Sequence, residues 1–134
     1  MPELSEIARK NFTKKGLDYL TVYTGDAVKF DDIDDYNYFF FYNPFTGTIL
    51  DAVVKQLGKS LNRNPRKITL LYQNPQGRDL FINSGLFPYI VSCFVPSLIN
   101  FDKNNRRYMR QFIDIYCTEP LRIDFAKHGI KIIE

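Results

Sequence analysis

An Asn-Pro-Phe motif follows a strongly aromatic run of the chain. The stretch DDIDDYNYFFFYNPFTG (residues 31–47) holds four aspartates, then the aromatic run 36–42, and then Asn43-Pro44-Phe45. An apolar run of strand length that meets Asn-Pro ends there, because proline does not fit the interior of a sheet. Ligands of open α/β sheets bind beyond the carboxyl ends of parallel strands. Asn43, Pro44 and Phe45 are therefore candidate residues for binding and chemistry.

Metal and thiol chemistry find less support in the sequence. The single histidine, His128, has no cysteine or second histidine near it at ligand spacing, so we expect no metal site and a surface position. Cys93 and Cys117 each lie inside an apolar, strand-like run. This pattern favours small buried thiols over a disulfide or a reactive cysteine.

The composition is that of a globular protein. The chain has 134 residues, of which 45% are hydrophobic and 16% aromatic, and we expect one domain over residues 1–134. No apolar run approaches the roughly 20 residues that a membrane-spanning helix needs. The N-terminus MPELSEIARK is charged where a signal peptide would be apolar. We therefore predict a cytoplasmic protein without a membrane partner.

The charge of the chain is modest but uneven. A net charge of +3 does not by itself call for a nucleic-acid partner. Acidic residues gather at 26–35, and the segment KNNRRYMR at 103–110 is basic. We interpret both segments as solvated loops.

The first part of the chain alternates between helical and strand-like patterns. Residues 2–16 place Leu4, Ile7, Ala8 and Phe12 at helical spacing, and Gly16 marks a stop. Residues 19–27 are rich in β-branched and aromatic side chains, which predicts a strand that closes at Gly25-Asp26. The aromatic run 36–42 is apolar on both faces, as expected for a central strand of a parallel sheet with helices on each side.

The middle of the chain continues the alternation. Residues 46–64 place Ile49, Val53, Leu57 and Leu61 four apart, which predicts a helix that ends at Asn64-Pro65. Residues 66–75 (RKITLLYQNP) predict a second strand that runs into Asn-Pro. Residues 76–85 predict a short helix stopped by glycine.

The pattern changes after residue 85. The runs 86–96 and 106–119 are both strand-like, with a polar, basic loop and no amphipathic helix between them. Two strands joined in this way form an antiparallel pair, so the sheet should finish as a mixed one. The tail 121–134 is compatible with a short strand or with irregular structure.

This order of elements, with LTVYTGDA, FFFYNPF and YQNP at the ends of its strands, resembles the later part of a class I S-adenosylmethionine-dependent methyltransferase. The resemblance runs over residues 2–118. It implies an α/β fold with a Rossmann-like methyltransferase sheet, N-terminally truncated, that is mostly parallel and ends in an antiparallel C-terminal strand pair. It also implies S-adenosylmethionine as cofactor and a methyl acceptor that the sequence does not identify.

The resemblance assigns roles to particular residues. Asp26 would accept a hydrogen bond from the adenine amino group, with the Ala27 backbone amide alongside. Asn43 and the Pro44 carbonyl would face the sulfonium and the incoming nucleophile, and Phe45 would offer its ring to a flat or cationic group. The proline would hold the chain extended at Asn43. Methyl transfer needs a placed nucleophile and excluded water, and no covalent residue.

The sequence departs from the family at its beginning. Family members hold the cofactor with a glycine-rich loop after the first strand and an acidic residue that ends the second. Pro2 and Glu3 already match the helix after the second strand, so both elements would precede Met1 and Glu3 is not that acid. The edge of residues 38–42 would then be exposed. We expect either direct pairing with residues 20–25 or a homo-oligomer that covers the edge.

Structural explanations compete with each functional one. Asn43-Pro44 also serves as a plain strand terminator, as at Asn74-Pro75, Asp26 suits a turn, and Phe45 suits a core. Two other functions remain open. One is a noncatalytic methyltransferase-fold remnant or interaction subunit. The other, which the small net charge disfavours, is a nucleic-acid-binding module that uses residues 103–110 with Tyr108 for stacking.

Overall fold

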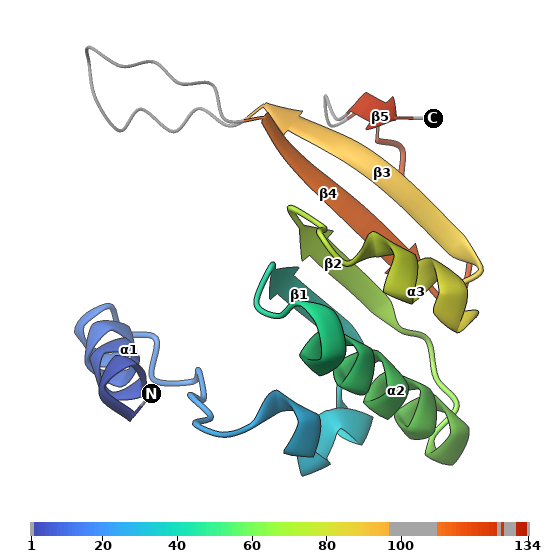
Figure 1. The fold of residues 1–134 in the computed structure, drawn as a ribbon. Coiled ribbons are helices and arrows are strands. Elements are labelled where there is room, and N and C mark those ends of the chain that lie inside the picture. The colour runs from blue at the N-terminus through green and yellow to red at the C-terminus, as the bar shows by residue number, and fades with distance from the viewer. Residues whose placement is uncertain (1, 97–109, 126, 128–130, 134) are drawn as a thin grey trace. The chain divides into compact units, whose positions relative to one another are not determined.

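The computed structural model describes residues 2–96, 110–125, 127 and 131–133. The chain divides into two compact units, residues 1–31 and residues 32–134, which are described separately (Figure 1). The basic segment 103–109 and His128 lie outside the described residues. The single methyltransferase-like domain over residues 1–134 stays a prediction.

The first unit is built on the predicted N-terminal helix. Helix α1 spans Pro2–Lys14 and stops just before the predicted stop signal Gly16, whose φ of 67° suits glycine. The Leu17 backbone amide donates to the Phe12 carbonyl at 2.9 Å and turns the chain back. The Arg9 side chain then donates to the Val22 carbonyl at 3.1 Å. These bonds tie residues 17–24 to the helix.

The predicted strand over residues 19–27 is wrong. Residues 19–26 form no strand, and Ala27–Lys29 form the short 3₁₀ helix η1. The β-branched and aromatic residues of this segment have a strand's composition, but a strand also needs a neighbouring strand for its backbone groups. Here the segment is anchored by Arg9 and by the edge-on contact of Tyr23 with Phe30.

The second unit holds an open, mixed five-stranded sheet in the order β1-β2-β4-β3-β5. Its strands are β1 Tyr38–Tyr42, β2 Thr69–Gln73, β3 Tyr89–Pro96, β4 Arg110–Cys117 and β5 Lys131–Ile133. The predicted antiparallel pair of β3 and β4 is confirmed. The mostly parallel sheet is not, because β1 with β2 is the one parallel pair among the described strands.

The aromatic strand β1 is an edge strand, and its predicted central position is wrong. It pairs with β2, and the sheet order gives it no second described neighbour. Phe39 and Phe41 are half-buried, whereas Tyr38, Phe40 and Tyr42 are 74%, 60% and 58% exposed. An apolar run on both faces therefore indicates a strand here without indicating its place in the sheet.

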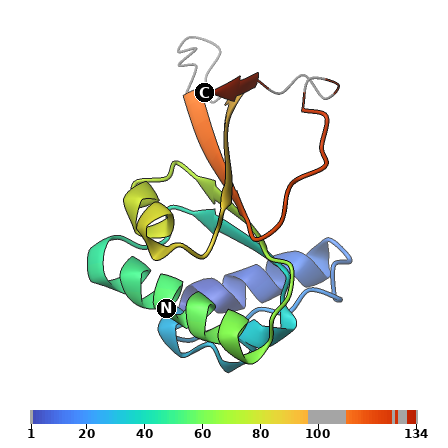
Figure 2. The same ribbon diagram turned by 90° about the vertical axis from the view of Figure 1, so that its right-hand side faces the viewer.

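Two helices, α2 Gly47–Arg63 and α3 Arg78–Ser84, cover one face of this sheet (Figures 1 and 2). The buried stripe of α2 is Leu50, Val53, Val54 and Leu57. Ile49 is exposed, so the stripe is rotated from the predicted one. Helix α3 ends as predicted at Gly85 in the left-handed conformation. Figure 2 shows the segment after β4 on the opposite side of the sheet from these helices.

An aromatic core joins the helices to the sheet. Phe81 of α3 is fully buried and contacts Tyr72 of β2 and Tyr116 of β4, with ring centroids 5.6 Å and 4.8 Å away. All these rings lie on the helix-covered face, since Leu70 is the register partner of Tyr116 and Tyr72 that of Asp114. This core fixes the loops that leave the ends of β1 and β2.

The acidic segment is solvated as expected, since Asp31, Asp32 and Asp35 are exposed, but it forms a short helix rather than a loop. Asp31–Asp35 form the 3₁₀ helix η2, with Ile33 buried. The Arg63 guanidinium donates two hydrogen bonds to the Asp34 carboxylate, at 2.8 Å and 2.9 Å. Arg66 donates to the carbonyl oxygens of Ile33 and Tyr36. Two arginines at and after the end of α2 therefore hold the chain that enters β1.

Candidate functional site

The two parallel strands, β1 and β2, are followed by the same Asn-Pro motif, and their carboxyl ends lie at the same end of the sheet. Tyr42 is the register partner of Gln73, so Asn43-Pro44 and Asn74-Pro75 leave neighbouring strands side by side. Asn43 has a φ of 44° and Asn74 a φ of 52°, which is the left-handed region. Asparagine tolerates this conformation better than most residues.

The expected extended backbone at Asn43 is wrong for this reason. A following proline favours extended backbone at the preceding residue, but Asn43 adopts the left-handed conformation, which asparagine reaches more readily than most residues. The chain bends at Asn43 and leads through Pro44 and Phe45 into α2. The placement of the motif at a carboxyl strand end is confirmed, and its backbone geometry is different from the prediction.

A buried tyrosine connects the two turns. The Tyr72 hydroxyl donates to Oδ1 of Asn43 at 3.4 Å and accepts a hydrogen bond from the Gly77 amide at 3.3 Å. Tyr72 is fully buried, and Asn43 is half-buried. This long hydrogen bond orients the Asn43 side-chain amide toward β2. The sequence offers one signal for this role, which is a tyrosine next to the polar end of the strand TLLYQ.

Gly77 is required by the close approach of the second turn to α2. A Cβ at this position would lie against Cδ2 of the fully buried Leu50, closer than real Cβ contacts allow. The amide of Gly77 can reach the Tyr72 hydroxyl because the backbone comes so near the core. A larger residue at position 77 would therefore also disturb the hydrogen bond between the backbone amide and Tyr72.

The other two residues of the motif differ in burial. Phe45 is half-buried, and its ring meets Phe41 edge-on with centroids 6.1 Å apart, so it caps the end of the aromatic core. Pro44 is exposed. Neither observation tests the proposed contacts of Pro44 and Phe45 with a nucleophile or a flat group, and these roles stay predictions.

Asp26 and Ala27 belong to the first unit. The Asp26 carboxylate accepts a hydrogen bond from the Val28 amide at 3.0 Å and caps η1, which is the turn role considered from the sequence. Ala27 is the first residue of η1. Asn43, Pro44 and Phe45 lie in the second unit, so the five candidate residues fall into two groups. The adenine contact of Asp26 stays a prediction.

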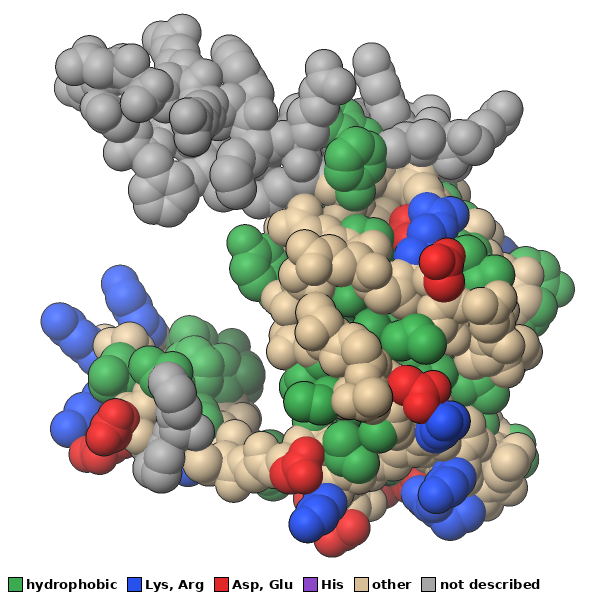
Figure 3. All heavy atoms as spheres, in the orientation of Figure 1, with side chains coloured by type: hydrophobic (Ala, Val, Ile, Leu, Met, Phe, Trp, Pro, Cys, Tyr) green, Lys and Arg blue, Asp and Glu red, His purple; other side chains and the backbone are tan. Residues whose placement is uncertain are grey.

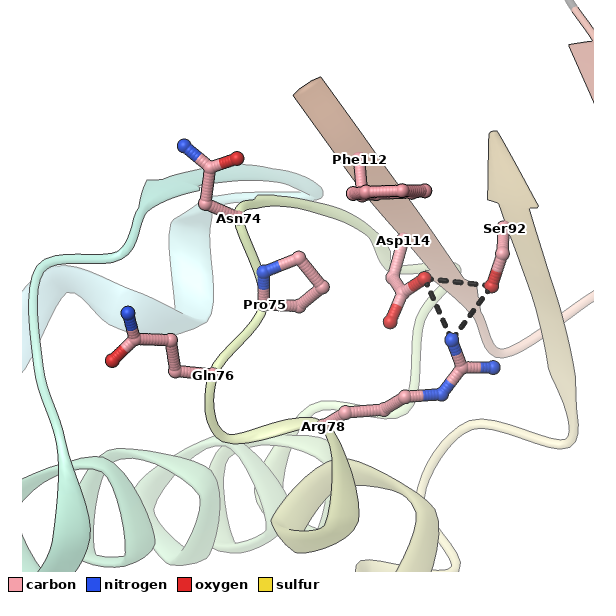
Figure 4. A pocket seen from close by; sticks show the side chains of 7 residues that line it. All are labelled: Asn74, Pro75, Gln76, Arg78, Ser92, Phe112 and Asp114. Atoms are coloured by element: carbon pink, nitrogen blue, oxygen red, sulfur yellow. Dashed lines mark hydrogen bonds and ion pairs between the residues drawn. The ribbon is translucent and has the colours of Figure 1, made fainter. Parts of the chain in front are cut away.

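A pocket of about 540 Å³ adjoins the turn after β2 (Figure 4). It lies between that turn, the start of α3, and strands β3 and β4. Its lining residues are Asn74, Pro75, Gln76, Arg78, Ser92, Phe112 and Asp114. The backbone N–H of Asn74 donates to the backbone carbonyl of Phe112 at 2.8 Å, which holds the turn against β4. Local sequence patterns did not predict this pocket, because its residues come from three separate segments, which are residues 74–78, β3 and β4.

A buried carboxylate organises the pocket. Asp114 is 1% exposed, and its Oδ1 accepts hydrogen bonds from Ser92 at 2.7 Å and from Arg78 at 3.1 Å. Its Oδ2 accepts from the Tyr116 hydroxyl at 3.0 Å. Burial, with the Asp114 carboxylate beside it, raises the pKa of Tyr116, so this hydroxyl remains a donor. An aspartate in the apolar run QFIDIYC was the one sequence signal for this arrangement.

The cysteines behave as expected. Cys93 and Cys117 are free and buried, and burial raises the pKa of both thiols. They are therefore protonated near neutral pH and are poor nucleophiles or metal ligands. Among the described residues, no group of three or more His, Cys, Asp or Glu side chains could hold a metal ion.

The visible surface of the second unit mixes both signs of charge. Figure 3 shows acidic and basic side chains close together on this face of the described residues, without a broad basic surface. Exposed ion pairs include Lys55 with Asp51 and Lys67 with Glu119. The basic segment considered for nucleic-acid binding lies largely outside the described residues, so that alternative is not tested.

No protein-family model, curated protein or solved structure matched this chain when each was searched. Within the described part of the chain, every helix is too short or too polar to cross a membrane.

Proposed function

We propose that this chain is a methyltransferase-like protein whose second unit carries the acceptor side of a methyl-transfer site. The observation that carries this proposal is the position and support of Asn43. It follows the edge strand of a parallel pair, and its amide is held by the buried Tyr72 hydroxyl. Ligands of open α/β sheets bind at such strand ends.

The topology of the second unit supports the proposal. A parallel pair is followed by an antiparallel pair, in the chain order that the methyltransferase resemblance implies. The last strand of this series, β4, lies between β2 and β3. A strand, a long helix, a strand and a short helix precede that pair at the predicted positions.

The Asn43 side chain suits the role of a positioning group. Oδ1 is already oriented by Tyr72, and the rest of the half-buried amide can meet a ligand at the sheet edge. An amide that is already oriented can hold a nucleophile in place with little reorganisation during the reaction. The acceptor itself is not identified by this residue.

The described residues supply only part of a site for S-adenosylmethionine. Each of the two parallel strands is followed by Asn-Pro and, at the start of the next helix, by one glycine, Gly47 or Gly77. Neither turn is a glycine-rich loop that could present several backbone amides to the amino-acid end of the cofactor. The fit is therefore incomplete, and high affinity is not expected from these residues.

A second candidate function is a noncatalytic interaction subunit with the same fold. The observation that favours it is the aromatic edge strand β1, which exposes Tyr38, Phe40 and Tyr42 on one face. An exposed, apolar edge strand is a template for pairing with another chain. In this case the turns after β1 and β2 would support the fold and would bind no ligand.

Calorimetric titration with S-adenosylmethionine and with S-adenosylhomocysteine tests the proposal. We expect a dissociation constant below about 1 mM, equivalent to a binding free energy better than about −4 kcal/mol. Asn43→Gly removes the amide and keeps the left-handed backbone, and it should weaken binding. Asp26→Ala tests the adenine contact, and Lys55→Gln on the surface of α2 is the matched control.

Two results would favour the noncatalytic alternative. One is the absence of heat with both ligands at millimolar concentration, for a chain whose circular dichroism shows it folded. The other is equal affinity of the wild type and Asn43→Gly. Loss of binding in the Lys55→Gln control would instead mean that the variants report general damage.

A further inference from the structure

The pocket beside the turn after β2 has a rigid polar floor. Asp114 and Ser92 satisfy each other and share one nitrogen of Arg78, Nη1, at 3.1 Å and 2.9 Å. Tyr116 occupies the other oxygen of Asp114. A network whose members are all hydrogen-bonded holds its side chains in fixed positions. Arg78 is therefore anchored at one end of its guanidinium.

The remainder of the Arg78 guanidinium is available. Its Nε and Nη2 donate to no described residue, and its side chain is 45% exposed. These N–H groups can donate hydrogen bonds to oxygen atoms of a ligand. Asp114 is a positioning residue, since it holds the guanidinium in place.

The walls of the pocket beside this floor are apolar. Figure 4 shows the Pro75 ring directed toward Asp114, with the Phe112 ring nearby. Phe112 is 45% exposed although it is aromatic. The amides of Asn74 and Gln76 point away from the Arg78–Asp114 pair, at the other end of the pocket. A ring-shaped ligand could lie against Phe112 and Pro75 and reach Arg78 with its substituents.

The charges of the lining residues cancel. Arg78 and Asp114 are the charged residues of the lining, one of each sign, and they form an ion pair. An anionic ligand at Arg78 would also face the Asp114 carboxylate, which opposes it. A neutral oxygen atom gains the Arg78 hydrogen bonds without that repulsion.

We infer that this pocket binds a neutral ring that carries hydroxyl groups. The apolar face of the ring packs on Phe112 and Pro75, and its hydroxyl oxygens accept from Nε and Nη2 of Arg78. A volume of about 540 Å³ accommodates one such ring with its substituents. A sugar and a phenol both have this chemistry. That the ring is also the methyl acceptor rests on the proposed function.

The experiment is a chemical-shift titration of the isotope-labelled full chain without cofactor. The neutral probes are methyl glucoside, as a sugar, and catechol, as a phenol. Their anionic counterparts are glucuronate and 3,4-dihydroxybenzoate, which keep the hydroxyl groups and add a carboxylate. We expect a neutral probe to shift the amides of Phe112, Arg78 and Ser92, and to bind about tenfold more tightly than its anionic counterpart, the effect of about 1.4 kcal/mol. The neutral probe that binds shows whether the ligand's ring belongs to a sugar or to a phenol.

Two variants place the ligand in the pocket. Phe112→Leu removes the ring at a half-exposed position outside the Asp114 network, and Arg78→Lys keeps the charge but loses the fork of donors. Each should weaken binding about tenfold, as expected for loss of one good contact. Lys55→Gln should leave binding unchanged. Phe112→Leu keeps the test valid if Arg78→Lys disturbs folding.

Three results would overturn the inference. They are tighter binding of the anionic probes, no shift at the pocket with any probe at millimolar concentration, and unchanged binding in the Phe112→Leu variant. Because no cofactor is present, the outcome is independent of S-adenosylmethionine binding. A chain that binds the ring but not the cofactor would keep this pocket and contradict the methyltransferase proposal.

Discussion

The Tyr72 hydroxyl lies 3.4 Å from Oδ1 of Asn43 and 3.3 Å from the Gly77 amide, so one buried side chain ties together the turns that follow β1 and β2. The two turns therefore behave as one structural unit at the carboxyl edge of the parallel strands. A change at Tyr72 should affect both turns, although it is not itself exposed to a ligand.

Tyr72→Phe should destabilise the protein by about 1–2 kcal/mol, because it removes one hydroxyl and leaves two partners without it. The ring is retained, so the aromatic core should keep its packing. Urea denaturation gives the free energy of unfolding. Tyr38→Phe is the control, because Tyr38 is 74% exposed and should change stability by less than about 0.5 kcal/mol. Equal effects of the two variants would contradict the link between the turns.

Asp114→Asn should cost about 1–3 kcal/mol in free energy of unfolding, because three donors converge on a carboxylate that is 1% exposed. An asparagine amide group would place its own hydrogens against some of these donors. Arg78 is partly exposed and stays hydrated, which limits the loss. Glu119→Gln, at the exposed pair with Lys67, should have almost no effect. A neutral result for Asp114→Asn would remove its positioning role.

The Arg63 guanidinium lowers the pKa of Asp34 from its ordinary 3.8 to about 2. Because the folded state holds the ionised form, the stabilisation is complete above pH 3.8 and is lost as the pH falls through about 2. Arg63→Gln should move the pKa of Asp34 toward 3.8, whereas Lys55→Gln should leave it near 2. Carbon-detected NMR titration of the Asp34 carboxyl group measures both. A wild-type pKa near 3.8 would show that the ion pair does not form in solution.

The edge strand β1 predicts association between copies of the chain. The backbone groups on the outer side of β1 have no partner among the described strands, and Phe40 within this strand is 60% exposed. Sedimentation equilibrium should show a mass that rises with concentration, and Phe40→Lys should shift it toward the monomer. Ile49→Lys, at an exposed position of α2, should leave association unchanged. A wild-type monomer at every concentration would exclude association through β1.

The helices could be predicted from the sequence because their signals are local. Apolar spacing placed α1 and α2, and Gly16 and Gly85 marked the ends of α1 and α3. Strand composition was equally clear at residues 19–27 and 38–42, yet only the second became a strand. Pairing decides this difference, and local propensity does not report the partner.

The candidate site was only partly predictable for a related reason. The Asn43-Pro44 motif indicates the end of a strand. From it we predicted correctly that Asn43 lies at the carboxyl end of a strand in the sheet. Its support by Tyr72 joins residues 29 positions apart in the chain. The Arg78–Asp114 pair spans 36 positions. Contacts of this kind depend on the order of the strands in the sheet, and no local pattern of residues predicts the order β2-β4-β3.

The most direct measurement for the central proposal is a chemical-shift map of the isotope-labelled chain with S-adenosylhomocysteine. We predict that shifts concentrate at the amides of Asn43, Phe45 and Gly77, where the two strand-end turns meet. Asn43→Gly should reduce them, and Lys55→Gln should not. Shifts confined to other parts of the chain, or none at millimolar ligand in a folded sample, would contradict a methyl-transfer site at this edge of the sheet.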